Sequence, residues 1–257
     1  MSLSAIKKFK YIIATSLPFV CLLGIVILQG QEYKKLVKAD TREDYLNQEK
    51  EQARFIGLQQ QNSSLGFDNL AADLSYLNFV QYFGDRDARE TIGYSLVPDY
   101  FEVINKIDPR FTNAHLTLSI ANSMYAGDPG TSISLMEKAL NIVEPESKDA
   151  ALLWTSKGLD ELLFFGDKDA AIKSYKTATK WAEIEQAIRP DGLTIKDLEQ
   201  ALENTGEIEL KETQIRAWSS VLVYIKDKQR SREIINKINV LKAEVESLEK
   251  ASASQSL

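Results

Sequence analysis

Cysteine and histidine are almost missing from this chain, which has one of each in 257 residues. A closed zinc site needs about four ligands, usually drawn from these two residue types, so the composition argues against structural zinc. Positive charge is also scarce, because 31 Lys and Arg are outnumbered by 37 Asp and Glu. Nucleic-acid binding needs clustered positive charge. The sequence therefore predicts no metal, no cofactor and no nucleic-acid partner.

Motifs that carry catalysis are missing as well. The sequence has no nucleophile elbow, no glycine-rich phosphate loop and no metal-binding spacing. His115 has no motif partner that would make it a catalytic base, and we expect it on the surface or in a groove. No catalytic residue is predicted, and the protein is expected not to be an enzyme. An enzyme, or an accessory subunit of one, built on the same helical domain is the alternative.

Charge is missing from one long stretch, residues 11–28. Eighteen helical residues reach about 27 Å, close to the hydrocarbon thickness of a bilayer. Lys7, Lys8 and Lys10 lie just before this stretch, which favours a cytoplasmic N-terminus and a globular part outside the cytoplasm. A cleaved signal peptide is the alternative, but the residues up to Gly30 make a poor cleavage site. We predict an uncleaved, single-pass anchor in contact with the lipid bilayer, with Cys21 as a small apolar residue inside the span.

Gly-Asp pairs recur about 40 residues apart, at residues 84–85, 127–128 and 166–167. Each pair follows one apolar helical segment and precedes another. Glycine supplies a left-handed helix end and aspartate can cap the next helix, so each pair predicts two helices folded back antiparallel. The apolar face of such a hairpin is covered by the next hairpin, which predicts a stacked array.

This pattern resembles the tetratricopeptide repeat (TPR) family over residues 67–183. The second unit fits less closely than the third, and the first is degenerate, with about eight extra residues after Asp85. The segment SLGFDNLAADLSYLNFVQYFGD is also similar to membrane-anchored TPR proteins common in cyanobacteria, which implies a bacterial protein with its globular part in the periplasm or thylakoid lumen. The third unit, which has one residue inserted before its Gly-Asp pair, carries the family's residues at Trp154, Gly158, Gly166, Asp167, Ala171, Tyr175 and Ala178.

The C-terminal part of the chain shows an apolar seam over about two heptads. In a parallel homodimer the charges beside this seam would repel, so we expect it to pack inside its own chain, with an antiparallel partner helix as the second possibility. The seam consists of Ile234, Ile238, Leu241, Val245 and Leu248.

The predicted fold is all-α: an N-terminal transmembrane helix followed by a TPR-like α-solenoid of antiparallel hairpins and a long C-terminal capping helix. The predicted parts are an anchor over 1–30, a polar helical stalk or linker over 31–64, three TPR-like hairpins over 65–187, a C-terminal hairpin with its capping helix over 188–250, and a disordered tail over 251–257.

The TPR resemblance implies that the first helix of each unit lines a concave groove. Tyr82, Tyr125 and Phe164 hold equivalent positions and are predicted to form an aromatic ladder open to solvent. The basic residues of a carboxylate clamp are missing, so an apolar or mixed peptide, or a helix, is the expected occupant; alternatively, the chain's own C-terminal helix fills part of the groove. The expected function is a membrane-tethered scaffold or adaptor, for instance in assembly of a membrane complex. The predicted groove residues are Asn78, Gln81, Tyr82, Thr117, Met124, Tyr125, Ser156, Asp160 and Phe164.

Overall fold

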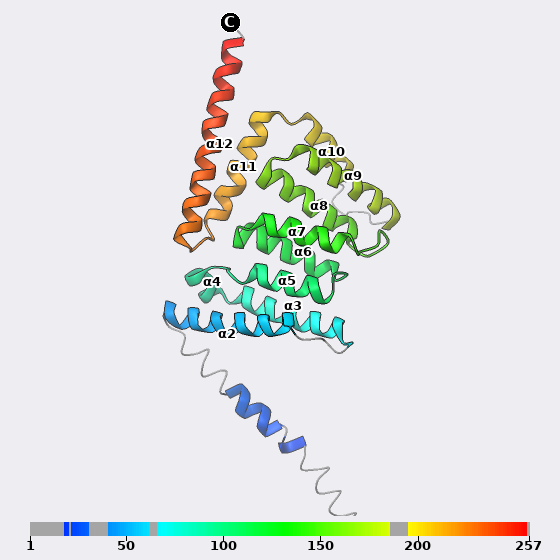
Figure 1. Cartoon of the computed structure of the whole chain (residues 1–257), viewed down its shortest axis with the longest axis vertical. Coiled ribbons are helices and arrows are strands. Elements are labelled where there is room, and N and C mark those ends of the chain that lie inside the picture. The colour runs from blue at the N-terminus through cyan, green and yellow to red at the C-terminus, as the bar shows by residue number, and fades with distance from the viewer. Residues whose placement is uncertain (1–17, 21, 31–40, 62–65, 186–194, 256–257) are drawn as a thin grey trace, which may run out of the picture. The chain divides into compact units, whose positions relative to one another are not determined.

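The computed structural model describes residues 18–20, 22–30, 41–61, 66–185 and 195–255. The chain forms two compact units, Met1–Gln48 and Glu49–Leu257, and the second contains all the contacts discussed below. Every regular element among the described residues is a helix (Figure 1), which confirms the all-α prediction. No helix in the described ranges is both long enough and apolar enough to cross a membrane. Residues 11–17 and Cys21 of the predicted span lie outside those ranges.

Helical hairpins make up most of the second unit. Two of their helices, α6 and α8, continue directly into π-helical turns, η1 and η2. The elements are α2 (Arg42–Gln61), α3 (Asp68–Gly84), α4 (Arg86–Ile92), α5 (Val97–Ile107), α6 (Thr112–Ile120), η1 (Ala121–Ala126), α7 (Pro129–Leu140), α8 (Ala150–Asp160), η2 (Glu161–Phe165), α9 (Lys168–Glu185), α10 (Ile195–Asn204), α11 (Glu207–Leu222) and α12 (Lys228–Gln255).

The hairpins stack in chain order. Helix α3 packs against α5, α6 against α7, and α8 against α9, while α6 also packs against α8, and α5 against both α6 and α7. This arrangement fits an α-solenoid (Figure 1). The shared core between the first hairpins is apolar and includes the fully buried side chains of Phe101, Ile104, Leu118, Met136 and Leu153.

The predicted glycine turns are present in two of the three units. Gly127 and Gly166 have φ values of 70° and 65°, in the left-handed region. Asp128 accepts a hydrogen bond from the backbone N–H of Thr131 at 3.1 Å, and the Asp167 side chain caps its helix in the same way. These contacts satisfy donors that a helix start leaves without partners.

The first unit turns differently from the prediction. Gly84 is not left-handed but ends α3 as a helical residue, and the positive φ of 84° falls instead on Gly93. The extra residues after Asp85 form a helix of their own, α4, which Asp85 caps through the backbone N–H of Ala88 at 3.2 Å. The insertion therefore moves the positive-φ glycine to the end of the added helix, where Gly93 has a ψ of −154° and so is not left-handed helical.

The residue inserted before Gly166 is accommodated by η2, since a π-helical turn takes one extra residue without ending the helix. The close approach of α8 and α9 is fixed at Gly158. A Cβ at this position would lie 2.7 Å from Cε1 of Tyr175, so only glycine lets the two helices pack at this separation.

Both ends of the predicted layout need correction. The predicted stalk, 31–64, is packed over its last turns, because Ile56 of α2 is 1% exposed and belongs to the core. Helix α2 is also tied to the first hairpin by Lys106, which donates to the carbonyl oxygen of Gln60 at 2.5 Å. The predicted disordered tail, 251–257, is wrong over 251–255, since α12 continues to Gln255; residues 256–257 lie outside the described part.

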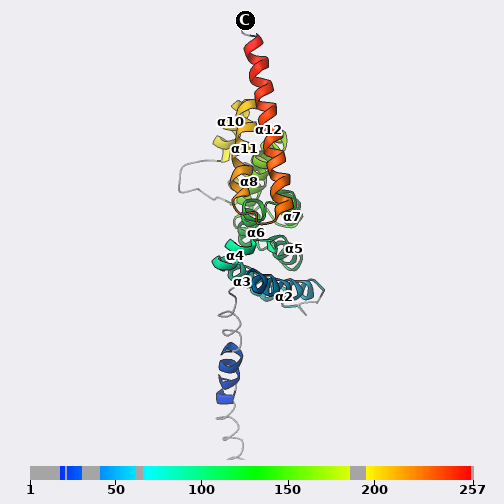
Figure 2. The same cartoon turned by 90° about the vertical axis from the view of Figure 1, so that its left-hand side faces the viewer.

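The C-terminal seam packs inside its own chain, as predicted. Ile234, Ile238 and Leu241 of α12 are buried, and α12 packs along α11. Helix α11 in turn packs against η1 and η2. Figures 1 and 2 show α11 and α12 running beside the stacked hairpins, so this pair contacts the end turns of the first helices in two units.

Candidate functional site

Two rows of side chains run across the first helices of the three units, five residues apart. We call Tyr82, Tyr125 and Phe164 the covered row, and Leu77, Ile120 and Leu159 the open row. Within each row, the residues precede successive Gly-Asp pairs by the same number of positions, on α3, on α6 with η1, and on α8 with η2. The two rows have opposite environments.

Tyr82 of the covered row is 1% exposed, which contradicts its predicted place in an open groove. Its hydroxyl donates to Oε1 of Glu49 at 2.9 Å and accepts from the backbone N–H of Leu96 at 3.1 Å. The guanidinium of Arg89 lies 3.7 Å from the ring centroid and pairs with Glu49 at 3.1 Å. Burial raises the pKa of Tyr82. This tyrosine fastens α2 and α4 to the first hairpin.

Phe164 is fully buried, so the predicted aromatic ladder is wrong at this position as well. Its ring meets Trp218 of α11 edge to face, 5.0 Å between centroids, and the Trp218 indole N–H donates to the Phe164 carbonyl oxygen at 3.3 Å. Met124 and Leu163, on η1 and η2, pack against the same apolar cluster. The chain's own C-terminal hairpin thus fills this part of the groove, the alternative that the sequence left open.

Tyr125 remains partly exposed, but its ring is not free. It lies 4.4 Å from the ring of Tyr224, in the turn between α11 and α12, and 5.1 Å from that of Tyr94. Phe83 completes the cluster at 5.0 Å from Tyr125. Arg230 of α12 donates to the Gly127 carbonyl oxygen at 2.6 Å beside it. Four segments of the chain therefore meet at Tyr125, which gives its ring a packing role.

The open row faces solvent. Leu77, Ile120 and Leu159 are 52%, 55% and 45% exposed, large fractions for aliphatic side chains on packed helices. Thr117, a predicted groove residue, is exposed beside them, and Ser156 is half-buried. Sequence reasoning missed the open row because it looked for aromatic rings; the signal was an aliphatic residue seven places before each Gly-Asp pair.

The remaining predicted groove residues on α3 line a separate depression. Asn78 and Gln81 border it together with Phe55 of α2, which is 50% exposed. The depression holds about 260 Å³. It lies next to Leu74, which is 50% exposed and one helical turn before Asn78. The apolar surface on α3 therefore extends beyond the open row.

Asp160 was predicted in the groove but lies in a buried polar seam between the second and third units. Its Oδ2 accepts a hydrogen bond from the Ser123 hydroxyl at 2.5 Å, and the same Ser123 oxygen lies 2.9 Å from the hydroxyl oxygen of Ser132. Burial raises the pKa of Asp160 to about 7, while the Ser123 hydrogen bond opposes the rise. Ser123 is fully buried, so it is not presented to a substrate. The seam fixes how two neighbouring units meet.

The buried polar seam around Asp160 continues along α8 with a buried ion pair. Lys157 pairs with Glu161 one turn later, and both side chains are 8% exposed. Ser174 of α9 donates to the second oxygen of Glu161 at 2.7 Å, so the buried charges are compensated and hydrogen-bonded, as buried charges must be. No group of three or more metal-ligating side chains occurs among the described residues.

His115 is buried, with no exposed surface, which corrects its expected surface or groove position. The imidazole packs 5.6 Å from the Phe101 ring and lies close to the backbone of Asp108 and Pro109, which opposes the fall in pKa that burial causes. Burial lowers the pKa of His115 to about 4. The histidine is a core side chain here.

Comparison of the chain with family models, with curated proteins and with solved structures found no match. The geometry therefore carries the functional argument alone.

Proposed function

We propose that this protein is a membrane-tethered scaffold of the TPR type that binds an apolar segment of a partner protein across the open row. The observation that carries the proposal is the exposure of Leu77, Ile120 and Leu159, each seven residues before a Gly-Asp pair, on the first helices of three successive units. A repeat array presents such recurring positions as one extended surface, and repeat proteins commonly use such surfaces for binding. A binding role needs no catalytic group, so we propose a non-enzymatic function.

Charge narrows the kind of segment that fits. The charged side chains of α6 and α8 are Lys157 and Asp160, and both are buried, as is Glu161 at the start of η2. The exposed residues of these two helices are Asn113, Thr117, Ile120 and Leu159. Over α6 and α8 a charged partner segment would lose its hydration without gaining an opposite charge, although Asp73 is exposed on α3 one turn before Leu77. An uncharged apolar helix or strand laid across the helices is the occupant that this surface favours.

The test is a matched pair of isoleucine variants of the full-length protein. Ile120 is 55% exposed in the open row, and Ile142, after α7, is 45% exposed outside it. A protein copurified with wild type should be lost, by at least about tenfold in affinity, when Ile120 becomes Asp, and retained when Ile142 becomes Asp. Equal retention by both variants would show that the open row is not the binding surface.

The tether is part of the proposal and rests on residues 11–28, which carry no charge. Full-length protein should stay in the membrane fraction after carbonate extraction, and protease added outside the cytoplasm should digest the helical domain. Recovery of a mature chain beginning near Gln31 would show cleavage instead of anchoring. Digestion only from the cytoplasmic side would reverse the proposed orientation.

A further inference from the structure

Two tyrosine rings meet where the turn between α11 and α12 reaches the second unit. The centroids of Tyr125, on η1, and Tyr224, in that turn, are 4.4 Å apart, with 40° between the ring planes. Tyr94 is more distant, at 5.1 Å from Tyr125 and 6.3 Å from Tyr224. All three rings are partly exposed. Tyr125 and Tyr224 are therefore the closest of these pairs and are open to small molecules in solution.

The hydroxyl groups of Tyr125 and Tyr224 lie close together as well. Burial raises the pKa of Tyr125, and the neighbouring Tyr224 hydroxyl raises it further, partly through a hydrogen bond. In tyrosine the Cε atoms flank the hydroxyl-bearing carbon, and these are the positions at which phenoxyl radicals couple. Contact between the two hydroxyls brings the Cε atoms of the two rings near each other. Holding reactive groups together in this way makes their coupling an intramolecular step.

A second tyrosine pair in the same chain provides a contrast. The rings of Tyr82 and Tyr100 are 5.5 Å apart, but they are only 1% and 2% exposed. The Tyr82 hydroxyl is also engaged, since it donates to Glu49. An oxidant in solution does not reach this buried pair, so nearness without access distinguishes it from Tyr125 and Tyr224.

No disulfide can fix the C-terminal hairpin to the array, because the chain has a single cysteine, Cys21. At the turn the observed contacts are non-covalent. They include the ring of Tyr224 against Tyr125 and the hydrogen bond from Arg230 to the Gly127 carbonyl oxygen at 2.6 Å. A bond between the two tyrosines would join segments that are far apart in the sequence.

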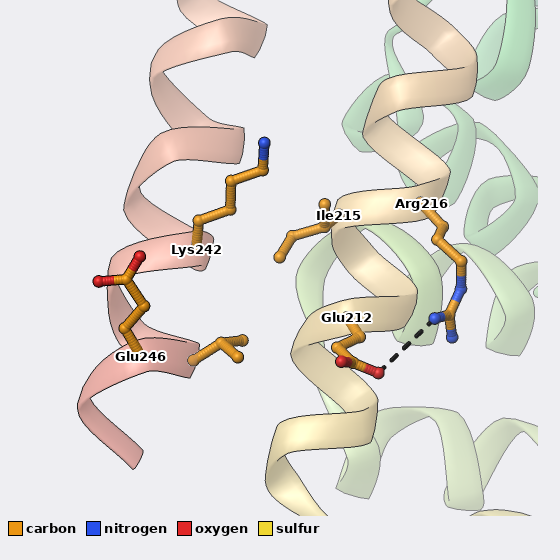
Figure 3. A pocket seen from close by; sticks show the side chains of 6 residues that line it. Glu212, Ile215, Arg216, Lys242 and Glu246 are labelled. Carbon is orange, nitrogen blue, oxygen red and sulfur yellow. Dashed lines mark ion pairs between the residues drawn. The ribbon is translucent and has the colours of Figure 1, made fainter. Parts of the chain in front are cut away.

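Away from the turn, α11 and α12 leave open space between them. A depression of about 350 Å³ lies there, with Ile215 and Lys242 among the residues that line it. Figure 3 shows Arg216 beside it, where the guanidinium pairs with Glu212 of the same helix at 3.7 Å. This ion pair fixes neither helix to the array. The turn, in contrast, contacts the second unit directly.

We propose that Tyr125 and Tyr224 form a modification site at which a peroxide, acting in one-electron steps, joins the two rings as dityrosine within one chain. Each phenol loses one electron and its hydroxyl proton, and the two radicals form a C–C bond between their Cε atoms. The ring hydrogens at those carbons then move to the oxygens, which restores both phenols. The two electrons and two protons reduce hydrogen peroxide, whose O–O bond breaks, to two molecules of water.

The link holds the C-terminal hairpin in the position that covers Phe164. Trp218 of α11 packs on that ring, and the linked turn directly follows α11. A bond between segments far apart in the sequence restricts the unfolded chain, as a disulfide does. The linked protein should therefore melt at a higher temperature than the unlinked protein.

The test treats full-length protein in neutral detergent with hydrogen peroxide and a small haem peptide as catalyst. Dityrosine fluorescence should appear in the single-chain band of a denaturing gel. Mass spectrometry of that band should find the tryptic peptides 111–138 and 217–226 joined, with a mass lower than their sum by two hydrogen atoms. Tyr224→Phe keeps the ring but removes the phenol, and it should lower the dityrosine yield by at least about tenfold.

Tyr76→Phe is the matched control. Tyr76 is partly exposed, and its ring neighbours are phenylalanines, so its loss should leave the dityrosine yield at the wild-type level. Before oxidation, the melting curve of Tyr224→Phe should match that of wild type, which separates loss of the link from loss of the fold.

The outcomes that overturn the proposal are distinct. Absence of dityrosine from single chains, or an equal yield from wild type and Tyr224→Phe, excludes the site. A link that joins peptide 90–106, which carries Tyr94, assigns the chemistry to another pair. Linked wild type that melts at the same temperature as unlinked protein shows that the bond does not hold the hairpin in place.

Discussion

The open row and the covered row lie five residues apart on the same helices, yet one faces solvent and the other lies within packed side chains. Phe164 has no exposed surface, whereas Leu159 is 45% exposed. The difference comes from α2, α4 and α11, whose side chains cover the end turns of the first helices. In this array the accessible part of a repeat surface is decided by what the chain lays over it, as well as by the repeat itself.

The largest effect on stability is expected for a substitution in the covered row. Phe164→Ala should lower the free energy of unfolding by about 3–5 kcal/mol, because it removes a fully buried ring beside Trp218. The adjacent Phe165 is 50% exposed, and Phe165→Ala should cost less than about 1 kcal/mol. Urea unfolding of both variants measures the difference. Equal losses of unfolding free energy in the two variants would mean that Phe164 is no more buried than Phe165.

Asp160, between the rows in sequence, should make stability depend on pH. Its pKa is raised from 3.8 to about 7 in the folded protein, so its protonated form stabilises the fold below pH 3.8, and this contribution is lost as pH rises through 7. His115 acts oppositely, since its pKa falls from 6.5 to about 4 on folding. Its contribution is present above pH 6.5 and lost as pH falls toward 4. The two partly cancel in wild type.

Asp160→Asn removes the contribution of Asp160 to the pH dependence of stability and leaves that of His115. Relative to wild type, the variant should be more stable at pH 8 than at pH 4.5, by on the order of 1–3 kcal/mol, because asparagine stays neutral in the buried seam. Denaturant titrations of both proteins at the two pH values give this difference. If it does not change with pH, Asp160 titrates normally and the seam is open to water.

A smaller effect is expected where α11 reaches the covered row. Gly166 is left-handed, and a Cβ there would lie 2.7 Å from the Gln214 side chain of α11. Gly166→Ala should therefore cost about 1–2 kcal/mol through backbone strain and this contact. Gly206 has a φ of −73° and open space where a Cβ would lie, but it is the N-cap of α11, where alanine is less favourable than glycine, so Gly206→Ala should cost less than about 1 kcal/mol. Thermal melts that rank the two variants the other way would contradict the turn assignment.

The smallest effect on stability is expected in the open row. Leu159→Ala should change the free energy of unfolding by less than about 1 kcal/mol, because its side chain is already half in water. The same substitution should weaken partner binding if the proposed function holds. A loss near that of Phe164→Ala would place Leu159 in the core.

Local features such as turns and helix caps could be predicted from the sequence. Which repeat positions are buried by distant segments of the chain could not. Gly166 and Asp167 predict a turn because glycine favours the left-handed end of one helix and the aspartate that follows it can cap the next helix. Predicting that Phe164 is buried needs the position of Trp218, which is distant in sequence and follows no repeat. The prediction that Tyr82 is exposed was wrong for a similar reason. Its ring is covered partly by Glu49 of α2, and the few apolar residues of that helix had suggested a stalk. Leu77, Ile120 and Leu159 were predictable in register, but aliphatic residues at such spacing more often indicate a core than a surface.

Hydroxyl-radical footprinting of the full-length protein, read at single residues by mass spectrometry, measures directly whether the first helices carry an open and a covered row. Aromatic side chains react intrinsically faster than aliphatic ones, so protection of the two rings would be a direct sign of their burial. After correction for intrinsic reactivity, Tyr82 and Phe164 should be protected at least about tenfold relative to Ile120, Leu159 and the neighbouring Phe165. Modification of Phe164 as fast as that of Phe165, or protection of Ile120 equal to that of Phe164, would contradict the division of this surface into an open and a covered row.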